Sequence, residues 1–281
     1  SNYVLDLAID NKEKLWIATD RGITIKNNDE QNTFRVLNIK DGLKSSLISK
    51  LEYLGDGLMA VGYYNDGFSI IDTKKNPYKI QHYTTDFEGI GNDEVQELYF
   101  DGNENLWIGT AMNGALEFNL ENRLFKHFDT DQGLNYFSVK SIIKDRESNI
   151  WIGTELGLNL FTGESFQLYN ESHGLNNNIV WSVDASDDGG IWIGTNAGLN
   201  YLKNGQFTSI SELNDEIIIT VYEDSRGILW MGTPGNGLYR YDKESKELEH
   251  VMSDGFLPDN TVYSINEDKD GNIWIGTKRA L

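Results

Sequence analysis

One short phrase recurs along this chain of 281 residues, and it limits the possible folds more than any other feature. It reads Ile/Leu-Trp-Ile/Met-Gly/Ala-Thr, and its tryptophans are Trp16, Trp107, Trp151, Trp192, Trp230 and Trp274. A seventh, weaker copy has Ala60 in the tryptophan position. Successive copies lie 38 to 47 residues apart. A period of about 40–50 residues is typical of the blades of a β-propeller.

Each repeat contains short apolar runs of the kind that form strands. In the sixth repeat, four runs lie at 218–222, 229–232, 237–241 and 247–251, and they are rich in β-branched and aromatic residues. No stretch keeps an apolar period of about 3.6 residues over three turns, so we expect almost no helix. The seventh repeat stops at Ala280-Leu281, where its third run should begin.

These patterns predict an all-β fold, a β-propeller of seven repeats of about 43 residues with four-stranded antiparallel blades, the last blade incomplete. We expect a single domain over residues 1–281, because no change of composition interrupts the repeat. The predicted blades are 1–40, 41–86, 87–130, 131–171, 172–210, 211–251 and a partial one at 252–281.

The bulk composition excludes several kinds of partner. The net charge is −20, which disfavours nucleic acid and other polyanions. The chain has no cysteine, hence no disulfide or thiolate metal site, and no apolar run of about 18–20 residues that could enter a membrane. We therefore expect no nucleic acid partner and no direct membrane insertion by this segment.

Two kinds of loop recur between the runs. An acidic glycine turn, such as Asp268-Lys269-Asp270-Gly271-Asn272, links the first and second runs and has the residues of a tight hairpin. Calcium is the alternative, but Arg279 stands where a calcium loop needs its last glutamate, so we expect no metal and no cofactor. The second kind links one repeat to the next, and we expect its apolar residue to pack between blades. Its copies are Asp41-Gly42-Leu43, Gln132-Gly133-Leu134, His173-Gly174-Leu175 and Asp254-Gly255-Phe256-Leu257.

The full pattern resembles the two-component regulator propeller repeat. It is carried most clearly by residues 139–158 and 262–277, and the resemblance covers essentially the whole chain. The resemblance implies the periplasmic sensor region of a bacterial hybrid histidine kinase, whose kinase activity lies in other domains. It also implies an oligosaccharide ligand, an adjoining propeller and immunoglobulin-like domain of the same polypeptide, and a homodimer in the full-length receptor. On this interpretation, the chain is a fragment of a longer ectodomain of an inner-membrane protein.

The pattern predicts that the repeated tryptophans are core residues. Each lies between apolar neighbours within a run, and an equivalent position in every repeat of a ring is a packing position between blades. We expect Gly153 and its equivalents to let adjacent sheets approach closely.

The candidate ligand-binding residues are those that break the repeat on one face of the disc. Because strands alternate in direction, the Thr-x-x-Gly loops and the connections between repeats share this face, which we call the loop face. Trp181 stands out because it is the single tryptophan outside the repeated position. It belongs to a series that directly follows the first valine or its equivalent in each repeat: Leu5, Ser49, Gln96, Lys140, Trp181, Ile219 and Tyr263. The full candidate set is Arg21, Tyr63, Tyr64, Asn113, Tyr136, Glu155, Asn177, Trp181, Asn196, Asn236 and Tyr263.

Three functions remain open from the sequence. Aromatic rings with amide and carboxylate groups suit a neutral oligosaccharide, which favours a non-catalytic sensor. A propeller glycosidase or lyase is the alternative, with Asp66, Glu155 and Asp215 as its candidate carboxylates. The third is a scaffold for protein docking or dimerisation.

Overall fold

A computed structural model describes residues 3–29, 31, 33–84, 93–253 and 257–279 of the chain. Its strands form six four-stranded antiparallel sheets and one two-stranded sheet. The first sheet contains β1 (Val4–Ile9), β2 (Leu15–Thr19), β3 (Gly22–Lys26) and β4 (Phe34–Leu37). The second contains β5 (Ile48–Tyr53), β6 (Leu58–Tyr63), β7 (Phe68–Asp72) and β8 (Lys79–Tyr83). The third contains β9 (Val95–Phe100), β10 (Asn105–Thr110), β11 (Ala115–Asn119) and β12 (Phe125–Phe128).

The remaining sheets repeat this order. The fourth contains β13 (Val139–Lys144), β14 (Ile150–Thr154), β15 (Gly157–Phe161) and β16 (Phe166–Tyr169). The fifth contains β17 (Val180–Ala185), β18 (Ile191–Thr195), β19 (Gly198–Lys203) and β20 (Gln206–Ser209). The sixth contains β21 (Thr220–Glu223), β22 (Ile228–Gly232), β23 (Leu238–Asp242) and β24 (Leu248–Val251). The two-stranded sheet pairs β25 (Val262–Glu267) with β26 (Ile273–Thr277).

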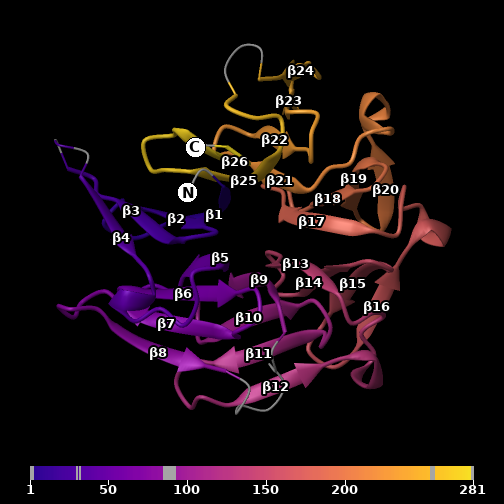
Figure 1. Cartoon of the computed structure of the whole chain (residues 1–281). Helices are drawn as coiled ribbons and strands as arrows, with labels where there is room; N and C mark the ends of the chain where they lie inside the picture. Colours follow the sequence, from indigo (N-terminus) through magenta and orange to yellow (C-terminus); the bar gives the residue numbers. More distant parts are fainter. Residues whose placement is uncertain (1–2, 30, 32, 85–92, 254–256, 280–281) are drawn as a thin grey trace.

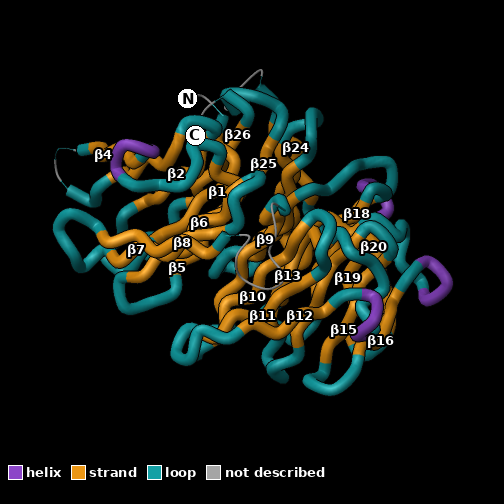
Figure 2. Tube along the Cα trace, turned by 60° about the horizontal axis from the view of Figure 1, so that its bottom comes forward, coloured by secondary structure: helices purple, strands orange, loops and turns teal. Residues whose placement is uncertain are grey.

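The sheets are arranged around one axis, with the first strand of each repeat innermost (Figure 1). The β25–β26 sheet lies beside β1, and the side-chain amide of Asn266 donates a hydrogen bond to the carbonyl of Leu7 over 3.4 Å. This contact closes the ring. Figure 2 shows the same strands turned by 60°, with the loops gathered at their ends. No helix of the described residues is long and apolar enough to cross a membrane.

The prediction was a propeller of seven repeats with an incomplete last blade, and the strand pairing corrects the count to six four-stranded blades. Six sheets have four strands, whereas the described part of the seventh repeat has two. The expected third run begins at Ala280-Leu281, which lies outside the described residues. The β-propeller class and the antiparallel four-stranded blades are confirmed.

The repeated tryptophans pack between sheets, as expected. Trp16, Trp107, Trp151 and Trp192 are buried. Trp230 and Trp274 are half-buried, because Trp230 packs against the two-stranded sheet and Trp274 belongs to it. Fewer strands beside an indole leave more of it open to water.

In six of the seven repeats, the glycine of the phrase permits the close approach of neighbouring sheets, and Ala18 holds this position in the first repeat. A Cβ atom on Gly109 would lie 2.6 Å from Cγ1 of Val139 in the next blade, and one on Gly276 would lie 2.7 Å from Cγ1 of Val4. Real Cβ contacts are longer, so any larger residue would push the blades apart. The last contact joins the seventh repeat to the first and shows that the same packing completes the ring.

The acidic turns hold the tryptophans through hydrogen bonds. In the turn before β14, Asp145 accepts hydrogen bonds from the backbone N–H of Asn149 and from the indole Nε1 of Trp151, both over 2.8 Å. Asp10, Asp224 and Asp268 bond the indoles six residues later in the same way. Among the described residues, no cluster of histidine and carboxylate side chains could hold a metal ion. The hairpin interpretation of these turns is therefore confirmed.

The connections between blades share one shape. Three of them contain a short 3₁₀ helix, namely η1 (Ile39–Asp41), η2 (Thr130–Gln132) and η3 (Glu171–His173). Each helix is followed by a glycine of positive φ and then by a buried leucine, which is Leu43, Leu134 or Leu175. Each leucine packs with residues of two neighbouring blades, as predicted. Of the fourth copy, residues 254–256 lie outside the described part, and η4 (Ser211–Leu213) serves the connection before β21.

Candidate functional site

A β-bulge in the innermost strand creates the ring of residues that faces the axis. In β1, Val4 pairs with Thr19 and Asp6 with Ala18, so Leu5 is the extra residue. The same shift of register occurs in β5, β9, β13, β17 and β25. A bulge leaves one residue outside the regular pairing and redirects its side chain. These six extra residues are members of the series that follows the valine position in the sequence, and Ile219 is the member without a recorded bulge.

These residues line a single cavity on the axis of the propeller. It encloses about 340 Å³, within the range of small-ligand sites. Its wall contains one residue of the series from every repeat: Leu5, Ser49, Gln96, Lys140, Trp181, Ile219 and Tyr263. Because these residues begin the innermost strands, the cavity lies at the end of the channel on the loop face. We call it the channel-mouth cavity. The prediction that this series shares one surface is confirmed.

Trp181 is held in a defined position at the cavity wall. Its indole Nε1 donates a hydrogen bond to Oδ1 of Asn196 over 2.6 Å. The ammonium group of Lys140 lies 5.2 Å from the centroid of its ring, a cation–π distance. Lys140 also forms a 2.9 Å ion pair with Glu155, which accepts a hydrogen bond from Ser138. Both the edge and one face of the indole are therefore fixed before any ligand arrives.

The charges that line the cavity are balanced. Lys50 and Lys140 supply two positive groups, and Glu94 and Glu97 supply two carboxyl groups. Burial raises the pKa of Glu94, and burial raises the pKa of Glu97 to about 7. Burial alone would lower the pKa of Lys50, but Glu97 and other carboxylates raise it above its ordinary value. The site has no excess of charge to attract an ion, which suits an uncharged ligand.

The hydrogen-bonding groups complete a surface suited to hydroxyl groups. Tyr64 and Tyr263 lie in the wall with Trp181, and burial raises the pKa of both phenols. Each phenol therefore stays protonated near neutral pH and can donate as well as accept. Gln96 adds an amide with the same dual capacity.

The structure brings five of the predicted residues together. Tyr64, Trp181 and Tyr263 line the cavity, while Glu155 and Asn196 hold its wall through Lys140 and Trp181. Tyr64, Glu155 and Asn196 share one position in the repeat, directly after the position that holds threonine in six of the seven phrases. Two positions of the repeat therefore supply the site.

Tyr63 does not belong to this surface, and its prediction as a ligand-binding residue was wrong. Its side chain is fully buried, and its hydroxyl donates to Ser69 over 2.9 Å. It occupies the threonine position of the phrase, which is buried in the other repeats too. There the hydroxyl of Thr154, for example, donates to the carbonyl of Gly157. The phenol of Tyr63 takes over this internal role.

The other five predicted residues lie outside the cavity wall. Asn177 accepts a hydrogen bond from the backbone of Ile179, and Asn236 donates to Glu216 over 2.7 Å. Tyr136 stacks on Phe137 at 4.1 Å between ring centroids. The backbone N–H groups of Arg21 and Asn113 bond to the threonine of their own hairpins. These contacts shape the loops, and ligand binding by these five residues stays a prediction.

Glu94 and Glu97 in the wall were not foreseen. Each stands within three residues of Gln96, at the start of β9, and the chain is rich in carboxylates. The signal that could have revealed Glu97 is Lys50, its ion-pair partner at 3.3 Å, which holds the matching position in the preceding repeat.

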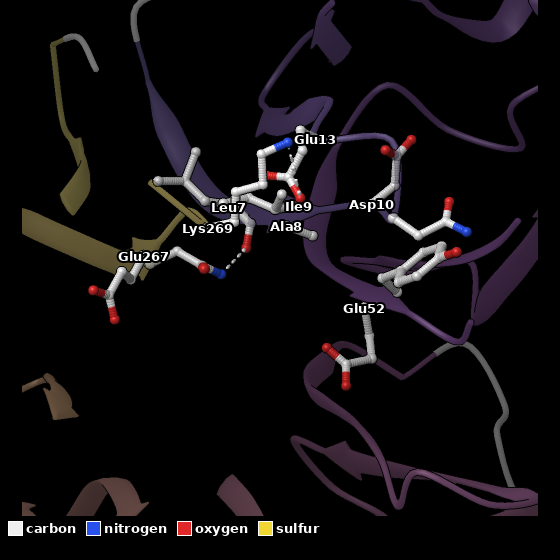
Figure 3. Close-up of a pocket in the computed structure, with 11 residues that line it drawn as sticks. Leu7, Ala8, Ile9, Asp10, Glu13, Glu52, Glu267 and Lys269 are labelled. Carbon is white, nitrogen blue, oxygen red and sulfur yellow. Dashed lines mark hydrogen bonds and ion pairs between the residues drawn. The ribbon is translucent and has the colours of Figure 1, made fainter. Parts of the chain in front are cut away.

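A second cavity lies where the first and last sheets meet, at the end of β1 that is remote from the channel-mouth cavity (Figure 3). Asp10, Glu13, Glu52 and Glu267 make it acidic, with Lys269 as its single cation. Its carboxylates have partners within the fold. Asp10 holds Trp16, Glu52 accepts from the backbone of Phe100, Glu267 accepts from Ser225, and Glu13 faces Lys269. This cavity reads as part of the ring closure.

The comparisons with known proteins agree with this architecture. Residues 202–235 and 257–279 match the family described as two component regulator propeller. These two segments are similar to the repeat of that family. The resemblance found in the sequence is thereby confirmed. No curated protein matches the chain.

Solved structures share the fold of these propeller repeats over essentially the whole chain. One is described as the extracellular domain of a hybrid two component system, BT3049, from B. thetaiotaomicron, with 23% identity and a TM-score of 0.87. Another, BT4673 from the same organism, has 22% identity and a TM-score of 0.83. The chain covers 38% of the length of each, and they cover 100% and 99% of it. Virginiamycin B lyase from Staphylococcus aureus has 13% identity and a TM-score of 0.79, covering 98% of this chain and 92% of its own. At these identities the likeness concerns the fold alone.

Proposed function

We propose that this propeller is the non-catalytic, periplasmic ligand-sensing part of a hybrid two-component sensor kinase. Its ligand is a neutral oligosaccharide bound in the channel-mouth cavity. The observation that carries this proposal is the fixed indole of Trp181 beside Tyr64 and Tyr263, in a wall of balanced charge. Aromatic faces stack on the C–H surfaces of a sugar, and the phenol and amide groups pair with its hydroxyls.

The repeat family and the sensor ectodomains of the same fold support this role. On this proposal, binding is transmitted through an adjoining propeller and an immunoglobulin-like domain of the same polypeptide, in a homodimeric receptor. The response is regulation of genes for polysaccharide use. The kinase reaction takes place in other domains of that receptor.

Calorimetric titration with a panel of neutral plant and host oligosaccharides tests the site. Trp181→Ala should weaken binding of the responding sugar by about tenfold or more, equivalent to roughly 1.4 kcal/mol. Tyr136→Ala is the matched control, because this aromatic residue lies on the loop face but outside the cavity wall. The Tyr136 variant should bind the sugar with the same affinity as the wild type. Equal affinity of the Trp181 variant and the wild type would show that the sugar binds elsewhere.

The same incubations separate sensing from catalysis. Lyases share the fold, and the three candidate carboxylates of the enzyme alternative were Asp66, Glu155 and Asp215. None of them lines the channel-mouth cavity, and Glu155 is engaged by Lys140. The hydrogen bond from Lys140 lowers the pKa of Glu155, which keeps it ionised and unable to act as a general acid near neutral pH. Saturable binding without new products is the expected result, and turnover would favour the enzyme.

A further inference from the structure

The groove between the fifth and sixth sheets is packed differently from the grooves before it. Between the third and fourth sheets, Trp107 stacks on Phe128 at 5.4 Å between centroids, and Phe128 meets Phe166 at 5.9 Å. Between the fourth and fifth sheets, Trp151 meets Tyr169 at 5.7 Å, and Tyr169 meets Phe207 at 6.0 Å. An aromatic ring from the outermost strand fills each of these grooves.

In the groove between the fifth and sixth sheets, smaller aliphatic residues occupy both of these aromatic positions. The strand register places Ile210 where Tyr169 stands in the preceding blade, and Leu248 where Phe207 stands. Trp192 packs on Tyr201 of its own sheet instead, at 4.3 Å. A hollow of about 410 Å³ remains between the two sheets, large enough for a small ligand. We call it the blade 5–6 hollow.

The wall of this hollow combines aromatic rings with polar groups. Trp192, Tyr201 and Tyr241 supply the rings, and Thr208, Ser209, Lys243, Lys246 and Asp188 supply hydroxyl, ammonium and carboxylate groups. A phenyl ring in this space would leave those polar groups unpaired, whereas a sugar ring has the same size and carries hydroxyls. The lining therefore favours a sugar over an aromatic ligand.

The charges of the hollow favour an acidic ligand. Asp188 forms a 2.9 Å ion pair with Lys203, and Lys243 is paired with Glu223. Lys246 lies 5.9 Å from the ring centroid of Tyr241 and has no carboxylate within ion-pair distance among the described residues. The lining residues carry two ammonium groups against one carboxylate, on a chain whose net charge is −20. One positive group is left to meet a ligand.

We propose that the blade 5–6 hollow is a second binding site, which takes a sugar ring bearing a carboxylate, such as a uronic acid. The ring stacks on the aromatic wall, where Tyr169 stands in the preceding blade, and the carboxylate meets Lys246. This site is independent of the channel-mouth cavity, because the two share no lining residue.

Calorimetry with galacturonic acid, glucuronic acid and their methyl esters tests this site. The wild type should bind one of the acids and bind its uncharged ester more weakly. Ile210→Tyr places in the hollow the residue that the preceding blade already carries, so the fold should tolerate it and binding should be lost. Lys246→Gln, an exposed change, should weaken binding by about two- to fivefold, and added salt should weaken wild-type binding similarly.

Trp181→Ala separates this site from the channel mouth. If uronate binding survives in the Trp181 variant and disappears in the Ile210 variant, the hollow is the site, whatever becomes of neutral sugars. Binding that is lost with Trp181, or unchanged in both the Ile210 and Lys246 variants, would overturn the proposal. So would the absence of binding by either acid at millimolar concentration.

Discussion

The contact between glycine and valine that recurs at five of the blade interfaces can be tested by placing a larger residue at one of these glycines. In Gly109→Ala, the new Cβ would lie 2.6 Å from Cγ1 of Val139 and 3.1 Å from Cβ of Glu97. Overpacking of this kind costs about 1–3 kcal/mol, which corresponds to a loss of roughly 3–9 °C in Tm for a chain of this size. Differential scanning calorimetry and urea denaturation measure the effect. Gly235→Ala is the control, because its Cβ would meet nothing within 4 Å, and we expect its stability within about 0.5 kcal/mol of the wild type.

A double-mutant cycle shows whether the clash itself causes the loss. Val139 is fully buried, so Val139→Ala alone should cost about 1–2 kcal/mol through lost burial. In the double variant, the atom that clashes with the new methyl group is absent. The double variant should therefore be more stable than the sum of the single changes predicts, by about 1 kcal/mol or more. Simple additivity, or a Gly109 variant as stable as the Gly235 control, would refute this account of the interface.

Two further predictions concern carboxyl groups that the fold engages. Asp145→Ala removes the acceptor that holds Trp151 and the Asn149 backbone, so the free energy of unfolding should fall by about 2–3 kcal/mol. Calcium should not raise the Tm of the wild type. Stabilisation by calcium would contradict the hydrogen-bonded interpretation of the turn. Burial raises the pKa of Glu52 to about 8, so the folded chain keeps a proton that the unfolded chain releases above its ordinary pKa, and stability should fall as the pH rises from 5 to 8. The side chain introduced by Glu52→Gln cannot ionise, so this variant should reduce the fall in unfolding free energy by on the order of 2–4 kcal/mol, as measured by urea denaturation at the two pH values. If the wild type and the variant lost the same stability between these pH values, Glu52 would be ionised in the fold.

The core could be predicted because the same core pattern recurs in successive repeats. One indole between apolar neighbours is ambiguous, but six at the same position of successive repeats have to satisfy one ring geometry. The hydrogen bonds from four of the repeated indoles to their own turns were not foreseen, because residues six apart in the sequence meet only after a hairpin has folded them together. Trp151 and Asp145 are joined in this way. Seven repeats were predicted and six four-stranded blades are found, because a repeat counted by its tryptophan need not contribute four strands.

The candidate site was predicted in part. Whether a predicted residue belongs to it depends on the face of the strand from which its side chain projects. Tyr63 and Tyr64 are adjacent and look alike in the sequence, yet the first points into the core and the second into the channel-mouth cavity. Side chains alternate between the two faces of a strand, so a shift of one residue reverses the role. The six threonines that share the position of Tyr63 were the available signal, because a position that holds one small residue in every other repeat is structural.

The bulge explains why residues that break the repeat can gather on the axis without disturbing the fold. An extra residue takes no part in the regular pairing, so its side chain is free of the packing that constrains Val180 before it and Ser182 after it. The bulge positions therefore hold residues as different as Leu5, Lys140 and Trp181 on an otherwise uniform ring. It follows that ligand specificity in such a propeller can change by substitutions at the bulges alone, while the glycine, valine and tryptophan positions that join the blades stay the same. An exchange of Trp181 for the Leu found at position 5 should then alter binding but leave the Tm within a few degrees of the wild type.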